Sequence, residues 1–363
     1  MRKRFVDSLV SLAKKNAIDA ILVCPSEELR FLMNFSPMMC ERFQGLFIKT
    51  DGTVFYICNL LYTGEIEKEF SNDGVKVYSW KDSDVMIDAI HGILTKEGLA
   101  GKIIGVNSTA PAFWTLEIAG KSGIKFVNAK PLLEESRIIK TAEELDNLRK
   151  SSVIVDEVFT EVIKFIKPGM TEGDIHSFMM AEMKKRGGRD VEGIVATGAN
   201  SSYPHYQGNS GVVEKQGVVL LDYGCTYNGM YSDMSRMVFV GGITDEQKKI
   251  YKIIQESIAA AEAATAEGAF IPNIDKAARD IIEKAGYGGG FMNRTGHGIG
   301  FMIHEAPDIK QSNPRKLEKG MAFSIEPGIN LTGRFGMRIE DIVIIGEKGT
   351  EILNKSTHDL VIV

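Results

Sequence analysis

Four carboxylates and one imidazole in the second part of the chain could together bind metal ions. They are Asp222, Asp233, His297, Glu326 and Glu340. Asp222, Glu326 and Glu340 lie in or beside apolar runs, where a carboxylate is partly buried and needs a partner or a cation. Four carboxylates in one pocket would raise one another's pKa values unless cations neutralised them. This donor set suits a borderline divalent ion such as Mn²⁺, Co²⁺, Zn²⁺ or Fe²⁺, and argues against a structural zinc site built from thiolates.

A predicted hairpin would bring the first two carboxylates together. Two apolar runs are joined by Asn228-Gly229, a pair that suits a type I′ turn because both residues tolerate positive φ. This turn would place Asp222 opposite Ser235. Asp233 would then lie on the same face of the pleat, diagonal to Asp222, and close enough to share a cation with it.

A second predicted hairpin, centred on Gly333, would put Glu326 directly opposite Glu340. His297 lies in a glycine-rich stretch, Thr-Gly-His-Gly-Ile-Gly, that lets the backbone and the imidazole approach a buried site. Each signal alone is commonly structural, since carboxylates near hairpins are usually solvated and a lone Gly-His-Gly is usually a turn. Their combination is what indicates a metal centre.

The order of these residues resembles the M24, or pita-bread, metallopeptidases, which include methionine aminopeptidase, aminopeptidase P and prolidase. The shared pattern is Asp, a second Asp eleven residues on, His in Gly-His-Gly, Glu in Ser-Ile-Glu-Pro, and Glu in Arg-Ile-Glu-Asp. His304 follows His297 by seven residues, as in the family pattern, and His205 in Ser-Tyr-Pro-His-Tyr matches the upstream active-site histidine. The motifs cover residues 140–363. Residues 1–135 fit the amino-terminal domain of the prolidase, aminopeptidase P and creatinase branch by length and pattern.

The resemblance implies a site with two divalent metal ions, with Mn²⁺ as the first expectation and Co²⁺, Zn²⁺ or Fe²⁺ as alternatives. Asp222 would hold one ion, and His297 with Glu326 would hold the other. Asp233 and Glu340 would bridge the two ions.

The resemblance also implies roles in catalysis. Glu326 would take a proton from the attacking water and pass it to the leaving amine. His205 and His304 would face the substrate and stabilise the oxyanion. Arg338 would orient carboxylates without touching a metal. Apart from the resemblance, the remaining histidines are expected to be surface or helix residues: His91, His176 and His358.

The substrate implied by the resemblance is a small peptide with proline at its second position, cleaved at the Xaa-Pro bond as by Xaa-Pro aminopeptidase or Xaa-Pro dipeptidase. Many dipeptidases of the family carry arginine soon after the His-Glu-x-Pro segment, where it can pair with the product carboxylate. Here Asp308 follows Pro307. Without that basic group we expect Xaa-Pro-Yaa peptides to be cleaved at least as well as Xaa-Pro dipeptides, and Xaa-Ala peptides much more poorly.

Other functions remain open. A metal-dependent pita-bread amidohydrolase acting on a non-peptide amide would keep the same ligands. A creatinase-like hydrolase, or a non-catalytic binding module of the same fold, would have lost them, whereas all five are present here.

Composition sets the remaining expectations. A chain of 363 residues with 44% hydrophobic and 25% charged residues is ordinary globular material and long enough for two domains. A net charge of −5 gives no reason to expect nucleic acid or a membrane as a partner. The four cysteines show no metal or disulfide spacing, and the basic start of the chain reads as an amphipathic helix. We expect a cytoplasmic protein, and the family suggests a homodimer.

The elements that must position these residues form two predicted domains, 1–135 and 136–363. The first alternates helices and strands, which indicates an α/β domain of the creatinase/prolidase type. Its expected helices are 3–16, 26–33, 84–97 and 110–121, and its expected strands are 18–24, 44–50, 53–58, 75–80, 102–106 and 125–128.

The second predicted domain is the α+β pita-bread catalytic domain. Capping boxes at Thr141 and Thr244, a cap at Thr171 and a helix-starting proline at Pro272 predict four helices, ending near residues 166, 186, 266 and 286. Two helices followed by a metal-bearing hairpin occur twice, which indicates a weak internal duplication.

Overall fold

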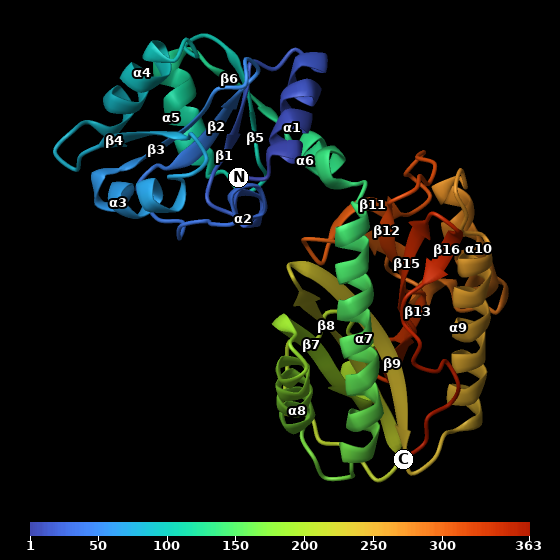
Figure 1. Cartoon of the computed structure of the whole chain (residues 1–363). Helices are drawn as coiled ribbons and strands as arrows, with labels where there is room; N and C mark the ends of the chain where they lie inside the picture. Colours follow the sequence, from blue (N-terminus) through green and yellow to red (C-terminus); the bar gives the residue numbers. More distant parts are fainter. The chain divides into compact units, whose positions relative to one another are not determined.

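The computed structural model describes all residues from 1 to 363 and divides them into two compact units, Met1–Arg137 and Ile138–Val363 (Figure 1). We call them unit 1 and unit 2. The expected boundary lay between residues 135 and 136. Each unit has a hydrophobic core of its own.

Unit 1 is built on one mixed six-stranded sheet in the order β4-β3-β2-β1-β5-β6. The strands are β1 (Ala20–Val23), β2 (Gly45–Lys49), β3 (Val54–Asn59), β4 (Lys76–Trp80), β5 (Ile103–Val106) and β6 (Lys125–Asn128). The helices are α1 (Lys3–Lys15), α2 (Glu27–Met33), α3 (Leu60–Glu69), α4 (Met86–Lys96), α5 (Ala112–Ser122) and α6 (Lys130–Arg137). The expected alternation of helix and strand is confirmed.

Two helices of unit 1 were not predicted. In α3 only Ile66 is buried, so the sequence carries no apolar stripe at helical spacing. The helix instead begins because the Asn59 side chain, at the end of β3, accepts a hydrogen bond from the backbone N–H of Leu61. Helix α6 spans eight residues, too few for periodicity to show in the sequence.

Unit 2 has the four predicted helices, α7 (Ala142–Phe165), α8 (Glu172–Lys185), α9 (Asp245–Ala263) and α10 (Ile271–Lys284). Thr141 and Thr244 form the expected capping boxes, Thr171 forms another, and the predicted proline lies in the first turn of α10. The strands are β7 (Arg189–Thr197), β8 (Gly217–Tyr227), β9 (Met230–Val240), β10 (Gly296–Gly298), β11 (Glu305–Ile309), β12 (Ala322–Ile325), β13 (Gly328–Leu331), β14 (Phe335–Arg338), β15 (Asp341–Gly346) and β16 (Gly349–Ile352). Two short 3₁₀ helices, η1 (Gly198–Ser202) and η2 (Gly288–Gly290), complete the unit.

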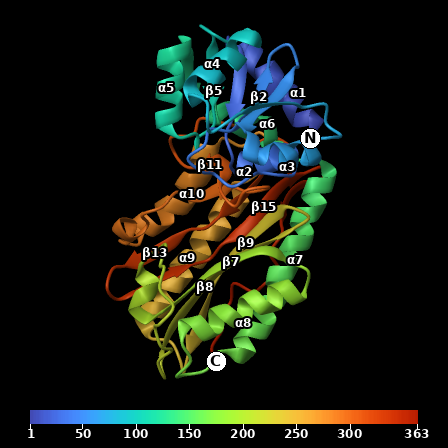
Figure 2. The ribbon, with the colours of Figure 1, turned by 90° about the vertical axis from the view of Figure 1, so that its left-hand side faces the viewer.

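The strands of unit 2 lie between two helix pairs. Helices α7 and α8 pack against β7, β8 and β9 on one side, and α9 and α10 pack on the other side (Figures 1 and 2). Along β8, Leu221 and Tyr223 join the core under α7 and α8, whereas Leu220 joins the core under α9 and α10. Because side chains alternate along a strand, Asp222 faces away from α7 and α8, toward the middle of the unit.

Candidate metal centre and active site

The hairpin of β8 and β9 has the predicted turn and register. Asn228 and Gly229 have φ values of 48° and 77°, as a type I′ turn requires. Asp222 lies opposite Ser235, and Asp233 lies opposite Gly224. The two carboxylates are therefore diagonal neighbours on one face of the sheet.

The second pair of carboxylates lies between two strand ladders that share one register. On one side Ile325 pairs with Asp341, and on the other Gly328 pairs with Arg338. Continuing either ladder places Glu326 opposite Glu340, as predicted. The hairpin of β13 and β14 turns at Gly333, whose φ of 75° is in the region that glycine adopts readily.

His297, on β10, brings its imidazole to the carboxylates. Its Nδ1 lies 3.1 Å from the carbonyl oxygen of Gly298, which can only accept, so Nδ1 carries the proton and Nε2 is free to bind a metal. Nε2 lies 3.5 Å from Glu326, 3.8 Å from Glu340 and 3.9 Å from Asp233. Burial, followed by the neighbouring His304, lowers the pKa of His297 well below its usual range, which keeps the ring neutral.

The electrostatics of this cluster favour a bound cation. Burial, followed by repulsion from nearby carboxylates, raises the pKa values of Asp233 and Glu340 well above their usual range. Burial also raises the pKa of Glu326, to about 7. One oxygen of Glu340, Oε1, is buried and has no hydrogen-bond partner. A buried carboxylate oxygen without a donor, 3.8 Å from a free imidazole nitrogen, fits a ligand for a divalent cation.

Arg338 lies among these carboxylates. It is buried, its Nη2 donates to Asp222, and its Nε donates to the Ser235 hydroxyl at 2.9 Å. That hydroxyl in turn donates to Glu340 Oε2 at 2.9 Å. Arg338 therefore orients Asp222 on the first hairpin directly. It also holds Ser235, whose hydroxyl orients Glu340.

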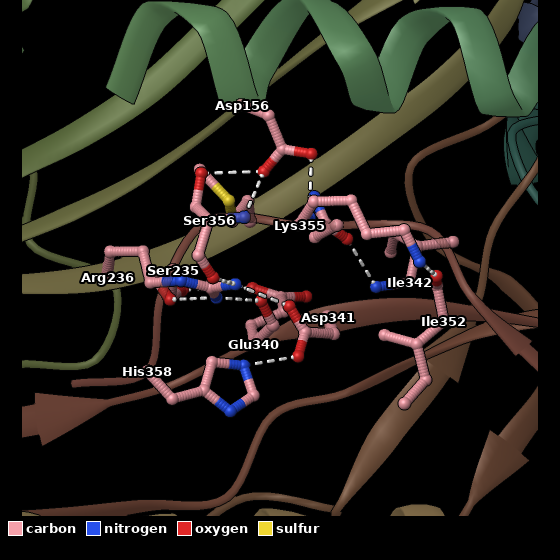
Figure 3. A network of polar contacts seen from close by, with 12 residues as sticks. Asp156, Ser235, Arg236, Glu340, Asp341, Ile342, Ile352, Lys355, Ser356 and His358 are labelled. Carbon is pink, nitrogen blue, oxygen red and sulfur yellow. Dashed lines mark hydrogen bonds and ion pairs between the residues drawn. The ribbon is translucent and has the colours of Figure 1, made fainter. Parts of the chain in front are cut away.

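A network that the sequence analysis missed fixes the backbone behind Glu340 (Figure 3). Arg236 is fully buried and donates to the carbonyl oxygens of Ser235 and Glu340, at 3.0 Å and 2.7 Å. Its Nη2 donates to Asp341 at 2.6 Å and to the carbonyl oxygen of Ser356 at 2.9 Å. An arginine within the apolar run of β9 was the available sequence signal.

The same network corrects the expectation for His358. Its Nε2 lies 2.6 Å from the second oxygen of Asp341, so it is a structural partner rather than a simple surface residue. Glu262, Asp341 and His358 lie close enough to suggest a second metal site. However, Asp341 already pairs with both Arg236 and His358, and burial followed by repulsion from Asp341 raises the pKa of Glu262 to about 8, so this cluster carries little uncompensated charge.

A cavity of about 830 Å³ opens over the cluster of carboxylates and His297. All the candidate site residues named from the sequence line it, including His205, His304 and Arg338. The ring of His304 meets that of His297 edge to face, with centroids 4.3 Å apart. Burial, followed by Arg294 and His205, lowers the pKa of His304, so its neutral ring can donate one N–H toward a substrate.

Other cavity residues were not anticipated, among them Arg294 and Lys310. Arg294 pairs with one oxygen of Asp308 at 2.8 Å and Lys310 with the other at 2.6 Å. Two cations facing one carboxylate leave a net positive charge. Basic side chains other than the arginine of many dipeptidases therefore lie beside Asp308 in this part of the cavity.

Two general expectations can be compared with the structure. In line with the absence of a metal or disulfide spacing, Cys225 is a buried free thiol in the core under α7 and α8. No helix combines the length and the apolar composition needed to cross a membrane.

Comparison with known proteins agrees with this geometry. Residues 146–347 match the model of metallopeptidase family M24, and residues 6–139 match that of the creatinase/prolidase N-terminal domain. The chain is 32% identical to a probable dipeptidase PepE of Mycobacterium tuberculosis over 94% of this chain and 92% of that protein. It is 30% identical to the Xaa-Pro dipeptidase of Pyrococcus horikoshii over 98% of both. A crystal structure of prolidase from Thermococcus sibiricus superimposes with a TM-score of 0.92, at 33% identity, covering 100% of this chain and 99% of that chain.

Proposed function

Because the chain belongs to metallopeptidase family M24, we propose that it is a metal-dependent exopeptidase that hydrolyses the Xaa-Pro bond of small peptides. The observation that carries this proposal is the meeting of four carboxylates and His297 under a cavity that also contains two further histidines. Relatives named Xaa-Pro dipeptidase, alignable over nearly the whole chain, support the choice of substrate.

The donor set fits two divalent ions: Asp222 would hold one, His297 and Glu326 would hold the other, and Asp233 and Glu340 would contribute to both. When bound, such ions lower the pKa of a coordinated water and polarise the scissile carbonyl. Four carboxylates and one imidazole without a thiolate support Mn²⁺ as the first choice, with Co²⁺, Zn²⁺ or Fe²⁺ as alternatives. The ion's identity, a homodimer and a cytoplasmic location stay predictions.

The chain's own residues would carry the proton and bind the substrate. Glu326, with a pKa of about 7, is suited to accept a proton from water through a carboxylate oxygen and to return it to the proline nitrogen that leaves. Neutral His304 would donate an N–H to the developing oxyanion. His205, in the segment between η1 and β8, would donate a second hydrogen bond to it. Arg338 would hold Asp222 and Ser235 in place.

The substrate carboxylate has candidate partners in Arg294 and Lys310. Both line the cavity, and their pairing with Asp308 leaves one positive charge uncompensated. A free carboxylate on proline would pair with this charge. We therefore expect Xaa-Pro dipeptides to be cleaved at least as well as Xaa-Pro-Yaa peptides, rather than the reverse order that Asp308 alone suggested.

The proposal is tested with the Mn²⁺-loaded protein and matched peptides. We expect hydrolysis of Leu-Pro, slower hydrolysis of Leu-Pro-amide because its terminal carboxylate is masked, and little hydrolysis of Leu-Ala. Arg294→Met should reduce the preference of Leu-Pro over its amide. Equal cleavage of Leu-Ala would remove the proline assignment, and activity only on non-peptide amides would favour the amidohydrolase alternative.

A further inference from the structure

A buried carboxylate outside the metal cluster organises the segment that carries His205. Glu172, the first residue of α8, is fully buried, and all its hydrogen-bond donors are neutral. Its Oε1 accepts from the backbone N–H of Thr197 at 2.8 Å and from Asn200 Nδ2 at 2.9 Å. Its Oε2 accepts from the Tyr206 hydroxyl at 3.0 Å and from the backbone N–H of Gly211 at 2.8 Å.

These donors lie on both sides of His205 in the sequence. Thr197 and Asn200 precede it, and Tyr206 and Gly211 follow it, so the carboxylate closes residues 197–211 into a loop around itself. The backbone reinforces the closure, since the N–H of Glu172 donates to the carbonyl oxygen of Gly211 at 2.8 Å. Fixing a loop from both ends restricts the residues between them.

The fit around Glu172 is tight. A Cβ added at Gly211 would lie 2.5 Å from the Glu172 carboxyl carbon and 2.6 Å from Asn200 Nδ2. Tyr206, the residue next to His205, also receives a hydrogen bond from Asn200 Nδ2 at 2.9 Å. The loop therefore has little freedom to shift while the Glu172 side chain stays in place.

The outer part of this loop forms a wall of the active-site cavity. Pro204, His205 and Gln207 line that cavity, whereas Tyr206 turns its hydroxyl to Glu172. His205 has no hydrogen bond of its own in the structure, so its position depends on the loop that carries it.

We propose that Glu172 is a positioning residue that sets the place of His205 over the metal cluster. This inference rests on the proposed function, in which His205 stabilises the oxyanion. Its consequence is a coupling between two residues on different elements: removing the charge of Glu172 should matter for turnover only while His205 is present.

The test is a double-mutant cycle on the full-length, Mn²⁺-loaded protein. Glu172→Gln keeps the shape of the side chain but replaces one accepting oxygen with an NH₂ group, which cannot accept hydrogen bonds from the loop donors. We expect kcat for Leu-Pro to fall by roughly 10- to 100-fold, with both metals retained. In a His205→Ala background, the same substitution should change kcat by less than about two-fold. Full additivity of the two losses, or no loss in His205→Ala alone, would overturn the proposal.

Asp174→Asn is the matched control. Asp174 belongs to the first turn of the same helix and caps it through Thr171, and its side-chain hydrogen bonds go to Thr171 rather than to the 197–211 loop. This variant should lower the melting temperature and leave kcat unchanged. If Asp174→Asn reduced kcat as much as Glu172→Gln, a general loss of helix stability would explain both, and the proposal would fail.

A second measurement separates this inference from the proposed function. Amide hydrogen exchange at Thr197 and Gly211 should accelerate in Glu172→Gln and not in Asp174→Asn, whatever substrate the protein cleaves. Unchanged exchange would refute the positioning role even in an active enzyme.

If Glu172→Gln does not fold, Tyr206→Phe removes one donor while keeping the carboxylate. It should give a smaller loss of kcat that again disappears without His205, and an additive loss would count against the proposal.

Discussion

At the scale of single residues, the histidines of the site differ in burial and in their distance from the carboxylates. His297 is buried, and its Nε2 faces three carboxylates within 3.9 Å, whereas the exposed His304 lines the cavity. His297→Ala should therefore lose metal. His304→Ala should keep its metal and lose turnover by about two or more orders of magnitude, the scale of one oxyanion donor. Metal analysis and kcat on both variants measure this, and metal loss from His304→Ala equal to that from His297→Ala would reverse the two roles.

The raised pKa of Glu326 predicts how the metal-free protein responds to pH. Burial raises this pKa to about 7, so the native state holds a proton that an unfolded carboxyl loses near pH 4. The stabilising contribution of this group is present at low pH and is lost as the pH rises through 7. In urea unfolding of the metal-free proteins, the free energy of unfolding of Glu326→Gln should rise relative to that of the wild type by roughly 2 kcal/mol between pH 5 and pH 8. Parallel pH curves for the two proteins would contradict the assignment.

At the scale of elements, the sequence predicted what local chemistry determines. The capping residues of α7, α8 and α9, the Asn228-Gly229 turn and the alternation along β8 are local signals, and the structure follows them. Arg236, which joins β9 to the segment before β15 and to the chain end, could not be predicted, because its partners Glu340 and Ser356 lie over a hundred residues away. Glu172 was missed because its partners, 25 to 39 residues further along the chain, are also outside the range of local patterns. Inside a helix-capping pattern it reads as an ordinary first-turn acid.

The Arg236–Asp341 pair makes a prediction about these elements. Both side chains are buried, so Arg236→Met removes the guanidinium from Asp341 and leaves only His358 beside that carboxylate, which should cost about 3–5 kcal/mol of unfolding free energy. Arg149→Met is the control, because the Arg149–Glu351 pair is about 40% exposed and should contribute about 0–1 kcal/mol. Chemical denaturation of both variants at one pH gives the comparison. Similar losses would mean that Arg236 acts mainly by packing.

At the scale of the whole molecule, the chain concentrates its chemistry in one of its two units. All five candidate metal ligands, together with His205 and His304, belong to Ile138–Val363, whereas Met1–Arg137 has a separate core under its own sheet. Fold class followed from sequence for both units, because alternating helix and strand signals and a repeated helix–helix–hairpin order are patterns within each unit. Helix α3 was not foreseen because it has no apolar stripe, and α6 was not foreseen because it is short. The pairing of Arg294 with Asp308 was not foreseen because folding brings the two side chains together.

This division predicts how metal binding stabilises the protein. A ligand that binds only the native state raises stability by mass action, by about 2.7 kcal/mol at a hundredfold excess over its Kd. Mn²⁺ should therefore slow amide exchange in the core strands β8, β9, β12 and β15 and leave that of β1, β2 and β5 unchanged. Hydrogen exchange read by mass spectrometry, with and without metal, measures both units in one sample. Asp233→Ala serves as the control, because it removes a bridging ligand and should abolish most of the protection. Equal protection of both units would mean that they unfold together, and protection of neither would mean that the carboxylate cluster does not bind the ion.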